Sequence, residues 1–318
     1  MRVRLQDIAD ETGVAVSTVS RALTDPSRVS AETAELVASA ASRLGYRLAR
    51  RHPSIEVMVQ DLDNPFLASF VSSTERQARL AGYTMTLSLS DDSGDLERAN
   101  AKRWARSEGG HILALRHLSD EEVLELAQTT TLVLFNREVE GVSSVAIDTD
   151  AGSVQAIEHL AALGHREVTY VAGPDASWSQ PRRRDSLARA AESRGIRLTS
   201  IGPYTPTAAQ GRLAADVIAA SGASAVVAFN DALAVGIVNR LREHGVEVPG
   251  GVSVIGYDDS VGAELCSPPL SSVSGPADRA AQLAIDTLLT LLDGSDRVTA
   301  HRVTGELVLR STTAPPPG

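Results

Sequence analysis

The sequence predicts an all-α head followed by an α/β body made of two doubly wound subdomains. One observation is a pair of short amphipathic segments, joined by a glycine, within residues 5–23. Another is an alternation of apolar strand-like runs and helical segments, which starts at Ile55 and restarts after Asp148. Because such alternation favours parallel βαβ units, we assign residues 1–53 to the head with its short linker and residues 54–318 to the body.

The head begins with a helical hairpin. Leu5, Ile8 and Ala9 repeat at helical spacing, Gly13 interrupts the repeat, and the spacing resumes over residues 19–23. Two short helices joined by a tight turn that contains glycine form the helix-turn-helix unit, whose second helix lies in the DNA major groove. Taken alone, the pattern also fits a small helical hairpin with no role in DNA binding.

A third helix is expected to begin after Ser30, which can cap its N-terminus, and to end at Gly45. An arginine cluster suited to phosphate contacts follows, made of Arg43, Arg47, Arg50 and Arg51.

The body is expected to alternate strands and helices along its whole length. The predicted strands cover residues 55–59, 83–89, 112–115, 132–135, 168–171, a stretch near 198, 226–229, 252–255 and 307–309. The predicted helices cover residues 65–81, 120–127, 153–163, 185–194, 211–220, 232–244 and 278–292, with a further helix between 89 and 112. The last segments are expected to cross back between the two subdomains.

Composition predicts a cytoplasmic protein. The chain has 43% hydrophobic and 22% charged residues, which is ordinary for a globular protein. Cys266 is its one cysteine, so neither an intramolecular disulfide nor a cysteine-based zinc site is expected. No apolar run approaches the ~20 residues of a membrane helix, and Arg2 and Arg4 are not followed by the apolar stretch of a signal peptide. We therefore expect no contact with a membrane.

Charge is distributed unevenly along the chain. The net charge is −10, but residues 1–53 hold eight arginines and six acids, a net +2 against −12 for the remainder. A small basic module on an acidic body fits a DNA reader joined to a domain with another task, although an asymmetry of this size can also arise by chance.

Short motifs run in order through the head: Asp7-Ile8-Ala9, Thr12-Gly13-Val14-Ala15, Thr18-Val19-Ser20-Arg21, Val29-Ser30, Thr33 and Leu44-Gly45-Tyr46. In these motifs the chain resembles the LacI–GalR family of transcriptional repressors. One position departs from the family, which usually has Ser where this chain has Ala15. Losing a capping side chain typically costs ~1 kcal/mol, and Ser17 is an alternative cap that would shift the start of the second helix.

The body also resembles that family, whose effector domain is built like a periplasmic sugar-binding protein. The matching landmarks are Asp63-Asn64-Pro65-Phe66, Ala81-Gly82-Tyr83, Glu158-His159-Leu160, Leu163-Gly164-His165-Arg166, Ala172-Gly173-Pro174, Asn230-Asp231, Val248-Pro249, Ser253-Val254-Ile255-Gly256-Tyr257-Asp258-Asp259 and Pro268-Pro269-Leu270. His159 and His165 fall within these blocks and are expected to pack or cap.

The resemblance implies a sequence-specific, DNA-binding repressor. Its operator affinity would be controlled by a small sugar-type or nucleoside-type effector in the cleft between the subdomains. A pseudo-palindromic double-stranded operator implies a homodimer or a dimer of dimers. Val16 and Ser17 would face base edges, Arg21 would contact a base or a phosphate, and backbone contacts would come from Thr18, Ser20, Arg47, Arg50 and Arg51.

Candidate effector residues lie just beyond predicted strands, where open α/β sheets bind ligands. Asn64 precedes Pro65 as an N-cap would, and Phe66 is either a wall of the cleft or a core residue. The resemblance implies that Asp231 contacts the ligand; capping of the next helix is its alternative role, and both can hold. The resemblance places the effector-holding arginine at Arg183. Because Ser186 stands where the family has Gly, Arg182 and Arg184 remain alternatives. Softer candidates are Ser177, Trp178, Ser179 and Tyr257.

No enzyme signature is evident. The chain has no Gly-x-Ser-x-Gly elbow and no His-Glu-x-x-His motif, and with Lys102 as its one lysine it cannot form a Walker phosphate loop. We therefore expect no catalytic residue, no cofactor and no metal site. The alternative function is a solute-binding protein of a transport system.

The linker between head and body is short. Family members have a hinge helix there, which docks in the minor groove and inserts a leucine. Here only residues 47–54 separate Tyr46 from Ile55, and two helical turns need ~7 residues. We expect a truncated or absent hinge helix and little operator bending. Leu48 is the one candidate wedge, with packing near Tyr46 as its alternative role.

Overall fold

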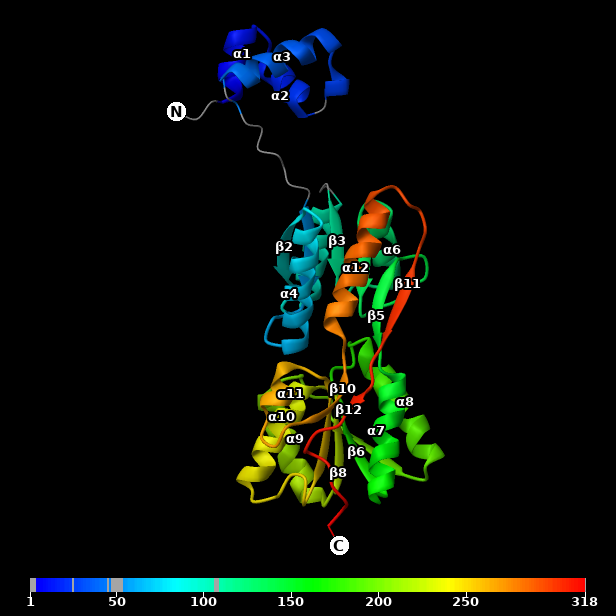
Figure 1. Cartoon of the computed structure of the whole chain (residues 1–318). Helices are drawn as coiled ribbons and strands as arrows, with labels where there is room; N and C mark the ends of the chain where they lie inside the picture. Colours follow the sequence, from blue (N-terminus) through cyan, green and yellow to red (C-terminus); the bar gives the residue numbers. More distant parts are fainter. Residues whose placement is uncertain (1–3, 25, 45, 47–53, 106–108, 318) are drawn as a thin grey trace. The chain divides into compact units, whose positions relative to one another are not determined.

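The computed structural model describes residues 4–24, 26–44, 46, 54–105 and 109–317. The chain forms two compact units, Met1–His52 and Pro53–Gly318, and Figure 1 shows the elements of each.

The first unit is a small helical domain with its own core. It contains α1 (Leu5–Thr12), α2 (Val16–Thr24), the short 3-10 helix η1 (Pro26–Arg28) and α3 (Ala31–Leu44). The core residues are buried and come from all three α-helices; they are Ile8, Ala9, Val19, Ala22, Val37, Ala40 and Ala41. The predicted helix-turn-helix unit and the third helix are therefore confirmed.

The helix ends follow from local sequence. Gly13 adopts φ 69 and ends α1 with its N–H on the carbonyl of Ala9, which is a conformation that favours glycine. Ser30 accepts a hydrogen bond from Thr33 N at 3.2 Å and so caps α3 as predicted. The alternative start of α2, after a cap at Ser17, is wrong. Helix α2 begins at Val16, because the carbonyl of Ala15 already accepts from Thr18 N and Val19 N.

The second unit contains two sheets, each with helices packed against it. The first is a six-stranded parallel sheet in the order β11-β5-β4-β3-β1-β2. Its strands are β1 (Ser54–Val59), β2 (Thr84–Leu89), β3 (Gly110–Leu113), β4 (Thr131–Phe135), β5 (Ser144–Asp148) and β11 (Ala300–Thr304). The helices of this subdomain are α4 (Pro65–Leu80), α5 (Gly94–Trp104), α6 (Asp120–Ala127) and α12 (Ala277–Leu292).

The second sheet has the order β12-β10-β9-β8-β6-β7 and is parallel except for the β10–β12 pair. Its strands are β6 (Glu167–Val171), β7 (Arg197–Ile201), β8 (Ala225–Ala228), β9 (Ser253–Asp258), β10 (Ser271–Ser274) and β12 (Leu307–Val308). The helices of this subdomain are α7 (Asp150–Leu163), α8 (Ser179–Ser193), α9 (Ala208–Ser221), α10 (Asp231–Glu243) and α11 (Val261–Leu265).

The chain passes between the subdomains three times, after β5, after β10 and after β11 (Figure 1). This confirms the predicted crossing back of the last segments. Four elements described in the second unit are absent from the prediction: β5, β10, β11 and α11. Helix α8 also begins at Ser179 rather than near Asp185, because Pro181 lies within its first turn, where proline is tolerated.

Close backbone contacts and polar ties fix the second subdomain. Helices α9 and α10 cross at Gly211 and Gly236, where an added Cβ would lie 2.1 Å from a carbonyl oxygen of the opposite helix. His165 contacts Ser224 Oγ at 2.9 Å and the carbonyl oxygen of Ala314 at 2.9 Å, while His159 Nε2 contacts Thr313 Oγ1 at 2.9 Å. The two histidines thus hold the C-terminal segment, in agreement with their predicted packing roles.

Candidate functional site

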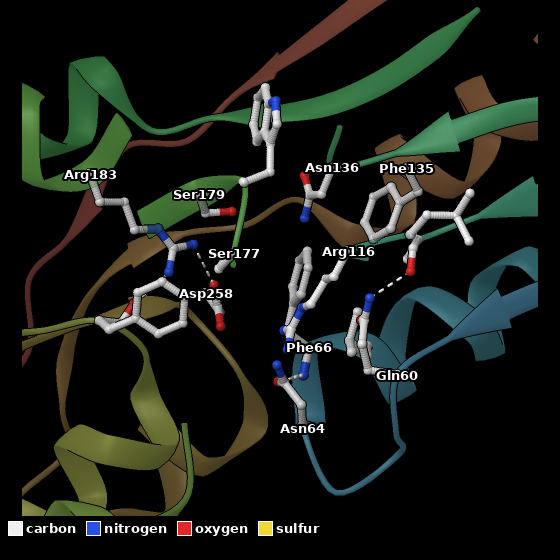
Figure 2. A pocket seen from close by; sticks show the side chains of 15 residues that line it. Gln60, Asn64, Phe66, Arg116, Phe135, Asn136, Ser177, Ser179, Arg183 and Asp258 are labelled. Atoms are coloured by element: carbon white, nitrogen blue, oxygen red, sulfur yellow. Dashed lines mark hydrogen bonds and ion pairs between the residues drawn. The ribbon is translucent and has the colours of Figure 1, made fainter. Parts of the chain in front are cut away.

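A pocket lies where strands of both sheets end (Figure 2), with a cavity of about 60 Å³. From the first subdomain its lining includes residues that follow β1, β3 and β4; these are Gln60, Asn64, Phe66, Leu67, Ala114, Leu115, Arg116, Phe135 and Asn136. From the second it includes Ser177, Trp178, Ser179, Arg183, Phe229 and Asp258. The carboxyl ends of parallel strands thus form the site, as expected for open α/β sheets.

Arg183 is the most firmly held polar side chain of the pocket. It is only 6% exposed, its Nη2 donates to Asp258 Oδ1 at 2.9 Å, and its Nη1 donates to the carbonyl oxygen of Phe229. The guanidinium also lies over two rings, 4.4 Å from the centroid of Tyr257 and 4.9 Å from that of Phe229. A planar guanidinium fixed in this way can offer the second hydrogen of an Nη atom to a ligand oxygen.

The neighbouring arginines take other positions. Arg182 stacks on Trp178 with 3.6 Å to the ring centroid, and exposed Arg184 forms an ion pair with Asp185. Neither lines this pocket, so the structure brings Arg183, of the three, together with the other pocket residues.

Asn64 and Phe66 are positioned by the start of α4. The Asn64 side chain accepts from Phe66 N at 3.0 Å, and Pro65 occupies the first turn. Phe66 is buried, lines the pocket and stacks on Phe135, with ring centroids 6.0 Å apart. Phe66 therefore has both of the roles considered for it, as a core residue and as a wall of the pocket.

Two strand ends carry strained backbones. Asn136 after β4 has φ 50, and Asp258 at the end of β9 has φ 100. Non-glycine residues rarely adopt this region, and such strain gathers at functional sites. Both side chains turn into the pocket (Figure 2).

Asp231 is not brought to this pocket. Its carboxylate accepts from Ser260 N and from Ser272 Oγ, both at 2.6 Å, and is 2% exposed. Burial first, and the nearby charge of Asp258 second, raise the pKa of Asp231 to about 7. The alternative role of Asp231 as a helix cap is wrong, because Asn230 supplies the cap of α10 through its bond from Leu233 N.

Tyr257 supports the site from behind. It is fully buried, does not line the pocket, and its hydroxyl bonds Ser153 Oγ at 2.7 Å. Burial raises the pKa of this phenol to about 12, so the ring remains neutral beneath the Arg183 guanidinium.

Sequence reasoning missed four polar pocket residues: Gln60, Arg116, Asn136 and Asp258. Gln60, Arg116 and Asn136 come within three residues of a strand end and Asp258 is the last residue of its strand. That position was the signal that could have identified them.

In the helical unit, the residues predicted to read DNA lie mostly on one face of α2. Val16, Ser17 and Arg21 are exposed and Ser20 is half-buried, whereas Val19 and Ala22 are in the core. Thr18 is half-buried as well. Arg43 pairs with Glu11 at 2.8 Å, tying α3 to α1. Arg47, Leu48, Arg50 and Arg51 lie outside the described residues.

A larger space of about 590 Å³ adjoins the pocket and shares Asn64 and Arg116 with it. Acidic side chains on this outer space are Asp61, Asp63, Asp91, Asp92 and Asp231. Within the described ranges no group of three or more His, Cys, Asp or Glu side chains is arranged to hold a metal ion. None of the helices found there is both long and apolar enough to cross a membrane.

Comparisons with known proteins match both units. Residues 4–48 match the family model of bacterial regulatory proteins, lacI family, and residues 157–313 match the periplasmic binding protein-like domain. The HTH-type transcriptional regulator reg1 of Streptomyces lividans is 30% identical, over 100% of this chain and 99% of its own length.

Two solved structures are similar over 98% of this chain and 100% of theirs, each at 26% identity. One is the Lac repressor bound to ONPG in the repressed state, with a TM-score of 0.77. The other is a complex of the transcriptional regulator CelR with cellobiose, with a TM-score of 0.73.

Proposed function

Because this chain belongs to the LacI family of bacterial regulatory proteins, we propose that it represses transcription by binding a pseudo-palindromic operator, and that a small effector controls this binding. The observation that carries the proposal is the exposed face of α2. A helix-turn-helix unit with a complete core exposes Val16 and Ser17 at the N-terminus of its second helix, and Arg21 in the last turn of that helix. The N-terminal residues of the second helix of such a unit face base edges in the major groove.

The proposed effector site is the pocket at the strand ends. Its lining comes from both subdomains, so a ligand that binds both walls favours one angle between them. A ligand shifts such an equilibrium by its differential affinity for the two arrangements. We propose a sugar-type or nucleoside-type effector, a class supported by the cellobiose complex of one structural neighbour.

Two related proposals follow. The active species is a homodimer or a dimer of dimers, because a single head buries little surface on DNA and a palindrome pairs two heads. The protein works in the cytoplasm, where its operator lies. The named relative is a regulator rather than an enzyme, and we assign no catalytic role to this chain.

An electrophoretic shift assay on the DNA upstream of the protein's own gene tests the function. We expect a shifted band at nanomolar protein, and an Arg21→Gln variant should bind about tenfold or more weakly, because a good base contact is worth ~1–3 kcal/mol. Arg212→Gln is the matched control, since Arg212 belongs to the second unit, is half-buried, and pairs with Glu243. A wild-type protein that shifts no upstream fragment would refute the proposal.

A further inference from the structure

We propose that the effector carries an anionic group, a phosphate or a carboxylate, and that Arg116 with the Asn64 and Asn136 side-chain amides binds this group. The inference rests on the proposed function, because it specifies the ligand of the same pocket. The observation that carries it is which hydrogen-bonding atoms of the lining already have partners.

The two asparagines turn their donors to the cavity. Asn64 Oδ1 accepts from Phe66 N at 3.0 Å, and Asn136 Oδ1 accepts from Ile147 N at 2.9 Å. A backbone N–H can only donate, so each bond fixes which end of the amide is oxygen. Neither NH₂ group has an acceptor within the described part of the chain, and both residues line the pocket.

Arg116 lies between them in the sheet. Strand β3, which precedes Arg116, is flanked by β1 and β4, which precede Asn64 and Asn136. Arg116 is 15% exposed at its side chain, and its Nη1 donates to Asp92 Oδ1 at 3.1 Å. Its other guanidinium nitrogens have no partner in the ranges that the structure describes, and the side chain extends toward the pocket (Figure 2).

A buried carboxylate holds the Arg116 loop in place. Glu97 of α5 is 0% exposed and accepts the backbone N–H groups of Arg116, His117 and Leu118 at 3.0, 2.9 and 3.2 Å. The loop that carries the guanidinium is therefore fixed before a ligand arrives. Preorganised donors of this kind lose little freedom on binding.

The start of α4 adds to the same wall. This helix has 16 residues, no acidic residue in its first turn, and a first turn that lines the pocket through Phe66 and Leu67. The positive end of a helix dipole favours an anion. On this wall, within the described lining, Arg116 is the one charged side chain.

The opposite wall differs in character. There Asp258 is paired with Arg183, beside the hydroxyls of Ser177 and Ser179. This wall suits the hydroxyl groups of a sugar, with the carboxylate as acceptor and the guanidinium as donor. The two walls together therefore fit a polyhydroxylated ligand whose anionic group lies toward Arg116.

The acidic side chains outside the cavity do not cancel this preference. Asp231 is buried and its carboxylate accepts from Ser260 N and Ser272 Oγ. Asp61 is half-buried, whereas Asp63, Asp91 and Asp92 are exposed, and solvent with salt screens exposed charges over about 8 Å at physiological ionic strength. Asp92 also shares its carboxylate between Arg116 and His117. We therefore expect ligand entry to be slowed more than ligand affinity is reduced.

The test is a thermal-shift and calorimetric comparison on the full-length protein at constant ionic strength. The probes are matched sets: glucose with glucose 6-phosphate and glucuronate, galactose with galactose 6-phosphate and galacturonate, and fructose with fructose 1-phosphate and fructose 6-phosphate. We expect at least one anionic member to bind at least tenfold more tightly than its neutral parent. The phosphate and carboxylate arms then identify which anion the site takes.

Two variants of Arg116 probe the assigned role. Arg116→Gln should weaken the anionic probe by about ten- to a hundredfold, the range for losing a charged hydrogen-bond partner, and should bring the anionic and neutral probes to similar affinity. Arg116→Lys keeps the charge and should retain part of the preference, which a loss of folding would not. Arg212→Gln should bind as wild type, since Arg212 lies outside these cavities.

Three results would overturn the inference. The first is a neutral sugar that binds as tightly as its anionic partner. The second is an anionic probe whose affinity is unchanged in Arg116→Gln. The third is that no anionic probe binds at 10 mM, a concentration at which even a Kd of about 1 mM would be detected. A wild-type protein that shifts its upstream DNA in the same preparation would show that the proposed function stands when the ligand assignment fails.

Discussion

Replacing Asp231 with asparagine should change how the stability of the α/β unit depends on pH. The Asp231 carboxylate is 2% exposed, and its pKa is raised from 3.8 to about 7. Between these values the folded protein binds a proton that the unfolded chain has released, so the free energy of unfolding falls as pH rises. Each pKa unit corresponds to 1.36 kcal/mol, which gives a loss of up to about 4 kcal/mol between pH 4 and pH 8.

An asparagine side chain at this position would not titrate, although it resembles the protonated carboxyl in shape. Asp231→Asn should therefore be similar to wild type, or somewhat less stable, near pH 4, and should gain relative stability at pH 8. The gain is expected to be smaller than the full 4 kcal/mol, because Ser272 Oγ and Ser260 N both donate to the carboxylate and only one can meet the amide oxygen.

Urea unfolding followed by tryptophan fluorescence measures this difference. Trp104 and Trp178 both belong to the second unit, so the signal reports on that unit. Asp216→Asn is the matched control. Asp216 is an exposed acid whose pKa is lowered by hydrogen bonds from Arg240 and His244, so it stabilises the folded protein as pH rises. Its removal should therefore lower the free energy of unfolding at pH 8 relative to wild type, which is the opposite of the change expected for Asp231→Asn. A stability difference between wild type and Asp231→Asn that stays constant from pH 4 to pH 8 would refute the reasoning.

Three further predictions concern the pocket and the linker. Glu97→Gln should lower the free energy of unfolding of the α/β unit by about 2–3 kcal/mol in urea, because the glutamine NH₂ group would face a buried backbone N–H group. An unchanged free energy of unfolding would show that the three bonds from backbone N–H groups to Glu97 are dispensable. Arg183→Lys should abolish the effector's effect in operator gel shifts, since an ammonium cannot hold both Asp258 and the Phe229 carbonyl; a normal response would remove Arg183 from the site. Circular-permutation gel shifts should show little operator bending, unchanged in Leu48→Ala; a strong bend lost in that variant would reveal a wedge.

Most of the fold could be predicted because its signals are local. Periodic apolar residues located α1, α2 and most strands of the body, and the exact match at α6 (Asp120–Ala127) reflects a capping box at Ser119 and Glu122 that lies within the sequence itself. Strands β10 and β11 were missed because their residues are polar or alternate weakly. They are strands only because neighbouring strands pair with them: β10 pairs with β9 and β12, and β11 pairs with β5.

The lining of the pocket was predicted in part, for a related reason. Arg183, Asn64, Phe66 and the Ser177–Ser179 segment line the pocket. Asp231 does not, because Ser260 N and Ser272 Oγ donate to its carboxylate. Both serines lie about thirty or more residues along the chain, so the local sequence does not reveal these bonds. A strand-end position places a side chain near the pocket, but only its long-range partners decide whether it faces the cavity or the core.

Asn136 shows the same dependence and allows it to be tested. Its amide oxygen is occupied by Ile147 N across the β4–β5 connection, so the NH₂ group faces the cavity beside Arg116. Asn136→Asp keeps the bond from Ile147 N, and its backbone φ of 50 is tolerated by aspartate as by asparagine. The change replaces a donor with a second, charged acceptor that opposes the Arg116 charge.

Binding of an anionic sugar to Asn136→Asp should weaken by about tenfold or more, while binding of a neutral sugar should hold or improve, because a hydroxyl can donate to the new carboxylate. Calorimetry with glucose 6-phosphate and glucose measures both arms. An Asn136→Asp protein that still prefers the anionic sugar by the wild-type factor would show that the orientation of this amide does not set the ligand class.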